Sequence, residues 1–237
     1  MPLLDSLNVG RPVPNPYKET RATGITKVAT PGPVQVRAPG PKTSGLGSGL
    51  VGDYVGDGKH HGGDDQALYA YAREDLDDWQ QELGRDLANG FFGENLTTRG
   101  LAVNAARLGE RWRIGSEVVV QVTCPRIPCS TFRGQMGERG WLRRFTLAGR
   151  PGAYLRIVTP GSICAGDAIE VVHQPEHDVT VELTFRALMT QPDLLPRLLA
   201  AGDDLMAELR QSALQHESNQ SACRAPDVCS SGQLQEE

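Results

Sequence analysis

The chain has 237 residues, 39% of them hydrophobic, and can bury the core of one sizeable domain or of a domain with an appendage. Its formal net charge of −5 argues against a nucleic-acid-binding protein, and no apolar run approaches the ~20 residues of a membrane helix. The N-terminus lacks the basic and apolar regions of a signal peptide, and five cysteines without a compact framework fit a reducing compartment. We therefore expect a cytoplasmic protein.

The first fifty residues predict short strands and loops. Residues 3–9 are a short apolar strand candidate, and residues 23–28 alternate as a second strand. Residues 34–37 are expected to pair with 23–28 as a hairpin, because Pro31-Gly-Pro33 lies between the two runs. Residues 38–49, rich in Gly, Pro and Ser, predict a loop.

A glycine-rich segment, residues 52–65, precedes a predicted helix over residues 65–89. Glycines free the backbone to approach a ligand, and such a turn before a helix is a general anion-binding arrangement. The spacing is not that of a P-loop, and a flexible polar loop is the plain alternative. Leu76, Trp79, Leu83 and Leu87 form one apolar stripe of the helix, so its carboxylates are expected on a solvated face.

The most informative stretch runs from the strand predicted at residues 117–122 to Cys129. Val118, Val119 and Val120 favour a strand, and the prolines at 125 and 128 are expected to end it. A cysteine directly after a proline, with Arg126 three residues earlier to favour thiolate, suits a reactive thiol or a soft-metal ligand. The alternative is a buried structural cysteine, which packs as a small hydrophobe.

Beyond Cys129 the chain is expected to turn from mixed to helical. Residues 130–148 are basic and suit a short helix or a lid, and residues 152–158 and 169–172 predict strands. Thr180 begins a helical run, and leucines recur over 192–214. Residues 215–237 are polar without periodicity and predict a disordered tail. The domain boundaries expected are 1–176, 177–214 and 215–237.

Six elements in this order and spacing resemble the MOSC domain, named for the C-terminal region of molybdenum cofactor sulfurases. They are Thr-Gly-Ile-x-Lys at 23–27, Gly-Asp at 52–53, His-Gly-Gly at 61–63, Phe-Gly-Glu-Asn-Leu at 92–96, Pro-Arg-x-Pro-Cys at 125–129, and Pro160-Gly161 followed by Ala165-Gly166-Asp167. The resemblance covers about residues 5–210 and is strongest to stand-alone bacterial members that reduce N-hydroxylated purines. The sequence departs from the family at Ser116, at the doubled histidine His60-His61 and in the long 38–49 loop.

The resemblance implies a mainly β fold with α additions: a MOSC-type β-barrel plus a small C-terminal helical extension. It also implies that molybdenum cofactor (molybdopterin) is bound, with Cys129 as the catalytic molybdenum ligand. The residues that match the family's cofactor contacts are His61, Gly62 and Asn95, with Thr23, Lys27 and Arg126 as polar or cationic contacts. Thiolate suits a soft metal, and Lys and Arg beside glycine-freed amides suit a phosphate.

Three functional hypotheses follow. The first is a molybdenum-dependent reductase of N-hydroxylated bases, hydroxylamines or amidoximes, supplied with electrons by a separate redox protein because the chain has no flavin, haem or iron–sulfur motif. The second is a sulfur-transfer or cofactor-carrier protein that uses a Cys129 persulfide. The third, a zinc site of His60, His61, Cys124 and Cys129, is disfavoured by adjacent histidines and loose cysteine spacing. No nucleic-acid or membrane partner is expected, and a homodimer is left open.

Overall fold

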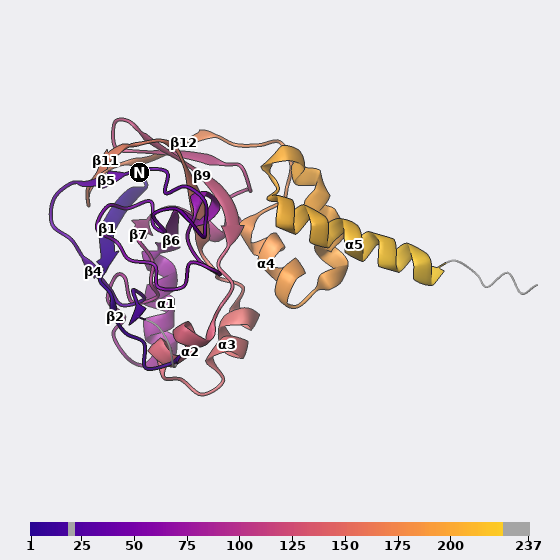
Figure 1. Cartoon of the computed structure of the whole chain (residues 1–237), viewed down its shortest axis with the longest axis horizontal. Helices are drawn as coiled ribbons and strands as arrows, with labels where there is room; N and C mark the ends of the chain where they lie inside the picture. Colours follow the sequence, from indigo (N-terminus) through magenta and orange to yellow (C-terminus); the bar gives the residue numbers. More distant parts are fainter. Residues whose placement is uncertain (19–21, 225–237) are drawn as a thin grey trace, which may run out of the picture.

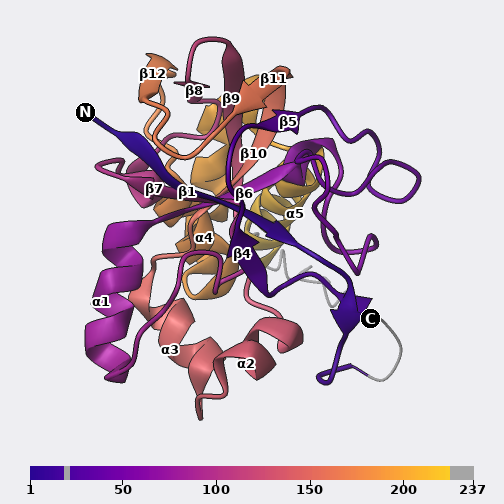
Figure 2. The ribbon, with the colours of Figure 1, turned by 90° about the vertical axis from the view of Figure 1, so that its left-hand side faces the viewer.

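The computed structural model describes residues 1–18 and 22–224, which form a curved β-sheet flanked by helices (Figures 1 and 2). The strands are β1 (Leu3–Gly10), β2 (Val13–Pro14), β3 (Ala22–Thr23), β4 (Lys27–Ala29), β5 (Val34–Val36), β6 (Leu68–Ala72), β7 (Leu96–Arg99), β8 (Arg111–Ile114), β9 (Val118–Pro125), β10 (Ala153–Thr159), β11 (Gly161–Ile163) and β12 (Ile169–His173). The α-helices are α1 (Arg73–Leu83), α2 (Ser130–Met136), α3 (Trp141–Ala148), α4 (Val181–Met189) and α5 (Ala207–Arg224). Three 3₁₀ segments complete the described part: η1 (Asp64–Gln66), η2 (Val103–Ala105) and η3 (Pro192–Asp204).

The main sheet has eight strands in the order β12-β8-β9-β10-β6-β7-β1-β4. All its neighbours are antiparallel except β6 and β7, which are parallel. Strand β6 is buried at every position because both faces of the sheet are covered there. Leu68 and Ala70 face one hydrophobic core, and Tyr69 and Tyr71 face the other. This central strand therefore contributes side chains to both hydrophobic cores.

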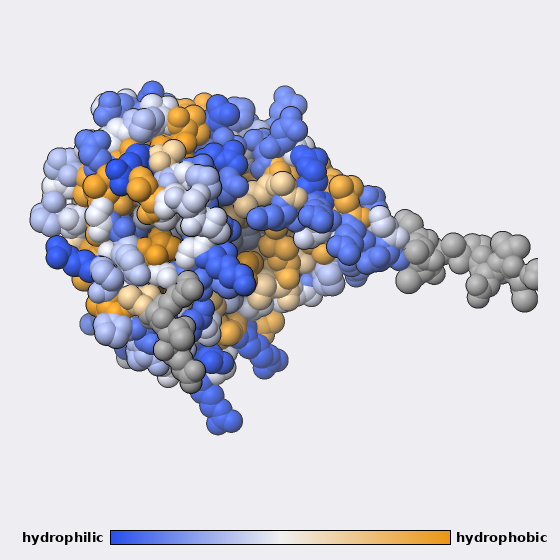
Figure 3. Space-filling view, viewed as in Figure 1, coloured by the Kyte–Doolittle hydropathy of each residue, from blue (hydrophilic) through white to orange (hydrophobic). Residues whose placement is uncertain are grey.

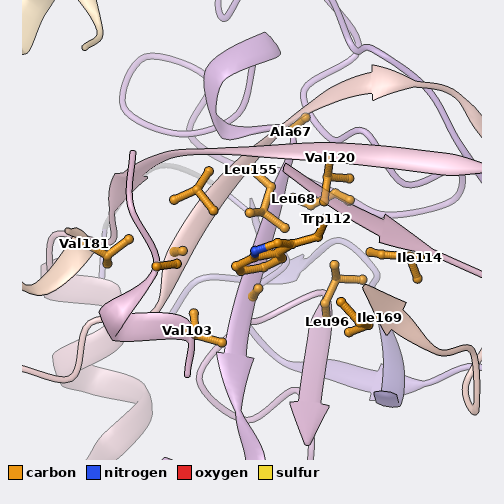
Figure 4. Packing of buried hydrophobic residues seen from close by; sticks show 14 of the residues in the cluster. Ala67, Leu68, Leu96, Val103, Trp112, Ile114, Val120, Leu155, Ile169 and Val181 are labelled. Atoms are coloured by element: carbon orange, nitrogen blue, oxygen red, sulfur yellow. The ribbon is translucent and has the colours of Figure 1, made fainter. Parts of the chain in front are cut away.

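The two cores differ in chemistry. The first is aliphatic around Trp112, whose ring lies among residues such as Leu155, Val120 and Ile114 (Figure 4). The second is aromatic: Trp79 of α1, Phe132 of α2, and Trp141 and Phe145 of α3 bury their rings together, mostly in tilted or edge-to-face contacts. Full burial of a large side chain contributes about 1.5–3 kcal/mol. Helices α1, α2 and α3 are therefore fixed to the sheet close to the end of β9.

A closed β-barrel is not observed, which corrects that part of the predicted fold. Among the described residues, β12 and β4 are the two edges of the sheet and do not pair with each other. The sheet curls until Leu3 of β1 forms an isolated bridge with Ala168, supported by the bond from the Leu4 N–H to the Asp167 carbonyl. The C-terminal half of β1 already pairs with β4 on that side. The isolated Leu3–Ala168 bridge, and not a continuous ladder of strand hydrogen bonds, therefore links the two sides of the curled sheet.

Two predicted elements are wrong. Residues 34–37 do not pair with 23–28: β5 pairs with β11, and β4 pairs with β1. The predicted helix over 65–89 is instead a 3₁₀ turn, strand β6 and the shorter helix α1. An apolar run buried on both faces has no strand-like alternation, which explains the error. By contrast, the helix expected within 130–148 is present as α2 and α3.

The C-terminal region is helical, as expected, and packs on the sheet. Helix α4 begins after Thr180, whose Oγ1 accepts the Leu183 N–H at 3.1 Å, and it contributes Val181 to the aliphatic core and Phe185 to the aromatic one. Helix α5 projects from the body (Figure 1). The tail predicted to be disordered from residue 215 is helical as far as Arg224, because the run is rich in helix-forming residues. The remainder of that prediction lies outside the described residues.

The face of the molecule seen in Figure 3 has apolar residues scattered among polar ones. Within residues 1–18 and 22–224, no helix has the length and apolar character needed to cross a bilayer.

Candidate functional site

Cys129 lies at the junction of the sheet and helix α2. Strand β9 runs three residues further than the predicted end at Val122, because Pro125 still pairs with Ala153 of β10. Cys129 then has extended backbone, and its carbonyl accepts the Arg133 N–H at 3.0 Å as α2 begins. The side chain is half-buried. The rigid Pro-Arg-Ile-Pro segment thus presents the thiol at the end of a strand held on both sides.

The surroundings of Cys129 favour its thiolate. Burial opposes ionisation, but a hydrogen bond from His61, the charge of Arg126 and the backbone N–H of Phe132 outweigh it and lower the pKa of Cys129 to about 6. The other strand-end cysteine behaves in the opposite way: burial raises the pKa of Cys124 to about 12. The two thiols, five residues apart, therefore differ in charge at neutral pH.

Arg126 is a buried cation with an open hydrogen-bonding position. Only 4% of the residue is exposed, and its guanidinium carbon lies 3.6 Å from the ring centroid of Phe132 and 5.4 Å from that of Tyr69. Its Nη1 is buried without a hydrogen-bond partner among the described residues. An unpaired buried donor costs about 1–3 kcal/mol, so this atom is suited to an anionic ligand.

A cavity of about 330 Å³ opens beside Cys129 and Arg126. Of the predicted site residues, it is lined by Thr23, His61, Arg126 and Cys129. Sequence reasoning did not single out the rest of its polar and aromatic wall, which includes Asn15, Lys18, Tyr54, Asp57, Lys59, Tyr69, Thr131 and Tyr154. These residues come from five separate stretches of the chain, and no spacing rule connects them.

Two loops close over this cavity by backbone-to-backbone contact. A Cβ on Gly24 would lie 2.1 Å from the carbonyl oxygen of Tyr54, and a Cβ on Gly56 would lie 2.1 Å from that of Ala22. Glycine is therefore required at both positions for the loops to meet. The glycine-rich segment shapes the wall of the cavity, as its composition indicated.

Three predicted contacts lie outside the lining of the cavity. Lys27 forms a buried ion pair with Oδ1 of Asp53, while Nδ2 of Asn95 donates to Asp53 Oδ2 at 2.9 Å. Asp53 Oδ1 also accepts the Gly10 N–H at 2.7 Å. Gly62 has positive φ, and a Cβ there would lie 2.5 Å from the Gly47 carbonyl oxygen. In this structure these residues hold the loops that support the cavity.

The rim of the cavity carries a small charged network. Lys18 Nζ lies 3.0 Å from Asp57 Oδ2, and His60 Nδ1 lies 3.2 Å from the same carboxylate. Although burial opposes it, these two partners lower the pKa of Asp57 to about 2. Tyr154 contributes its hydroxyl 3.4 Å from Nδ1 of His61. The two adjacent histidines therefore occupy different positions: His60 lies on the rim of the cavity, and His61 lies beside the Cys129 thiol.

The predicted zinc alternative gains no support from this geometry. Among the described residues, no group of three or more His, Cys, Asp or Glu side chains is placed to hold a metal ion. Cys124 is buried and is not among the residues that line the cavity with Cys129.

Comparisons with known proteins agree with the predicted resemblance. The family model for the MOSC domain matches residues 57–170, which include residues 57–65 of the glycine-rich segment and Cys129. The protein YflK of Bacillus subtilis is 31% identical over 182 residues, which is 76% of this chain and 78% of YflK. The chain belongs to the MOSC domain family.

Two further similarities concern the fold and the naming of relatives. The crystal structure of YiiM from Geobacillus stearothermophilus superposes with a TM-score of 0.72 at 24% identity, covering 91% of this MOSC protein and 99% of YiiM. A Gibberella moniliformis protein named Reductase is 31% identical over 132 residues, 54% of this chain but only 23% of that protein. The first shows that this chain has the fold of YiiM over nearly the whole length of both chains.

Proposed function

We propose that this MOSC protein is a molybdenum-cofactor-dependent oxidoreductase that reduces N-hydroxylated compounds with electrons from a separate redox partner. The observation that carries the proposal is the pairing, in one cavity, of a half-buried Cys129 thiol with a buried Arg126 whose Nη1 has no partner among the described residues. The residues present fit the cofactor, because a thiolate suits molybdenum and an unpaired guanidinium N–H suits a phosphate.

When bound, the cofactor supplies the two-electron chemistry that no side chain of the protein can perform. In the overall reaction, R–NH–OH takes two electrons and two protons; its N–O bond breaks, and R–NH₂ and water leave. Cys129 would hold the metal, and Arg126 and Thr23 would hold the anionic and polar parts of the cofactor. His61 would keep Cys129 ionised and stay beside it to hold a proton.

The electron donor is proposed to be a separate protein. The sequence shows no flavin, haem or iron–sulfur motif that would carry electrons to the site. We therefore propose a donor that docks from outside.

The test is elemental analysis of protein made in a host with abundant molybdenum cofactor, with Cys129→Ser as the matched variant. We expect about one molybdenum per chain in the wild type and little in the variant, which should keep its fold. Loaded protein should then reduce benzamidoxime with a chemically reduced viologen dye, so that the natural donor is not needed. Reduction at the wild-type rate by Cys129→Ser would refute the ligand assignment.

The alternative of sulfur transfer makes a different prediction for the same samples. The lowered pKa of Cys129 also suits a persulfide carrier, which needs a nucleophilic thiolate and no metal. Metal-free protein that carries a labile sulfur on Cys129, and that fails to turn over benzamidoxime, would favour this second function.

A further inference from the structure

Cys129 lines two cavities. The second, of about 350 Å³, shares Lys18, His60, His61, Cys129 and Tyr154 with the first. Its own wall is formed by Gln66, Pro125, Ile127 and Pro128. Arg126, Thr23 and the glycines of the first cavity do not line it. The thiol is therefore reachable from two chemically different sides.

The wall particular to the second cavity is mainly apolar. Pro125 and Pro128 restrict the backbone on either side of the Arg126-Ile127 pair, so the direction in which the Ile127 side chain leaves the backbone is restricted. Ile127 is 40% exposed, so part of its aliphatic side chain is open to a molecule in this cavity. The ring of Tyr154, which also lines this cavity, adds a flat aromatic surface. This wall suits an uncharged, flat molecule.

Gln66 supplies the polar group of this wall. The oxygen of its side-chain amide, Oε1, is buried without a hydrogen-bond partner among the described residues. An unpaired buried acceptor is costly, and a ligand N–H would satisfy it. The second cavity therefore combines an apolar surface with one acceptor.

The division of chemistry between the cavities assigns their occupants. The first has the unpaired cation Arg126 and suits the anionic cofactor, while the second reaches the same sulfur from an apolar side. We propose that the second cavity is the substrate subsite, in which a flat, uncharged N-hydroxylated aryl or heterocyclic compound packs on Ile127 and donates an N–H to Gln66. This assignment rests on the proposed function for its substrate class, and Ile127 and Gln66 become residues that determine specificity.

The test uses cofactor-free protein and does not depend on turnover. Iodoacetamide alkylation of Cys129 is followed by site-resolved mass spectrometry at increasing benzamidoxime concentrations. The wild type should show saturable slowing, because the ligand covers the sulfur from the second cavity. Ile127→Asp and Gln66→Leu should each raise the half-protecting concentration about threefold to tenfold, the effect of losing one buried contact or hydrogen bond.

Val171→Asp is the matched control, because Val171 is a similarly exposed aliphatic residue, 42% exposed, on β12. In this variant, benzamidoxime should protect Cys129 from alkylation at the same half-protecting concentration as in the wild type. The half-protecting concentration is used because it is independent of the intrinsic reactivity of each variant's thiol. Wild-type protection that is absent, or that is unchanged in both Ile127→Asp and Gln66→Leu, would overturn the subsite.

Turnover by loaded protein separates this proposal from the proposed function. Saturable protection that the two variants weaken, without any reduction of benzamidoxime by loaded protein, would support the subsite and refute the reductase. Active loaded protein whose KM is unchanged in both variants, together with unaltered protection, would support the reductase and refute the subsite.

Discussion

The guanidinium of Arg126 stacks on the ring of Phe132, with its central carbon 3.6 Å from the ring centroid. The two residues flank Cys129 in the sequence, so this contact folds the segment back on itself and places the thiol between a cation and the first turn of α2. Cation–π contacts contribute about 0.5–2 kcal/mol. The contact thus positions the guanidinium beside the thiol. Its Nη1 has no hydrogen-bond partner among the described residues.

Replacing Arg126 should separate stability from cofactor retention. Arg126→Met removes the cation–π contact but also removes an unpaired buried donor worth about 1–3 kcal/mol. We expect the free energy of unfolding of cofactor-free protein to stay within about 1 kcal/mol of wild type, or to rise, while molybdenum content falls severalfold. Urea unfolding and elemental analysis measure the two quantities. A variant that unfolds far more easily would show that Arg126 has a structural role instead.

The reactivity of Cys129 should depend on pH in a defined window. Thiolate is the reacting form, so alkylation of cofactor-free protein should increase through a midpoint near pH 6. The thiol of an unfolded cysteine has a pKa of about 9, so the lowered pKa of Cys129 stabilises the folded state fully above pH 9, and this stabilisation is lost as the pH falls through about 6.

Two variants check the cause of that midpoint. His61→Gln removes the charge and ring N–H beside the sulfur and should move the midpoint upward. Cys124 should stay unmodified throughout the neutral range, because it is buried and its pKa is raised to about 12. Equal alkylation of Cys124 and Cys129 at pH 7 would contradict the assignment.

Lys27 should behave as a structural residue. Its side chain is 7% exposed and that of Asp53 is 1% exposed, and removing one partner of a buried pair costs about 3–5 kcal/mol. Lys27→Met should lower the free energy of unfolding by that order. The exposed pair of Arg197 and Asp178 offers a control, since Arg197→Met should cost about 0–1 kcal/mol. Wild-type stability with lost molybdenum would instead make Lys27 a direct cofactor contact.

Two glycines in one loop offer a matched comparison. Gly56→Ala places a Cβ 2.1 Å from the Ala22 carbonyl oxygen, while Gly58→Ala places one 3.3 Å from that of Lys42. We expect Gly56→Ala to lower the free energy of unfolding by about 1–3 kcal/mol and to reduce cofactor retention. Gly58→Ala should change stability by about 0.5 kcal/mol or less. Equal thermal unfolding of the two variants would contradict the close approach.

The sequence was informative where local chemistry determines the structure. The β-branched run before Cys129 forms β9, and the adjacent Arg126 does lie beside the thiol. The predicted contacts Thr23 and His61 also line the cavity. These features depend on short-range backbone restrictions and on residue types that have few other uses.

Other features depend on partners distant in sequence. Lys27 and Asn95 have polar side chains that suit a ligand or an internal carboxylate equally, and the partner here is Asp53. The pairing of β5 with β11 and the open edge of the sheet are likewise set by long-range geometry. The aromatic alternation within β6 was hidden because Leu68 and its neighbours are buried on both faces.

The position of Tyr69 and Tyr154 on neighbouring central strands has a consequence for maturation of the protein. These residues line the first cavity from two strands that pair with each other in the main sheet. The loops on its other side are held by glycine contacts and by the ion pair of Lys18 and Asp57. Entry of the proposed cofactor would therefore require those loops to part while the paired strands stay together.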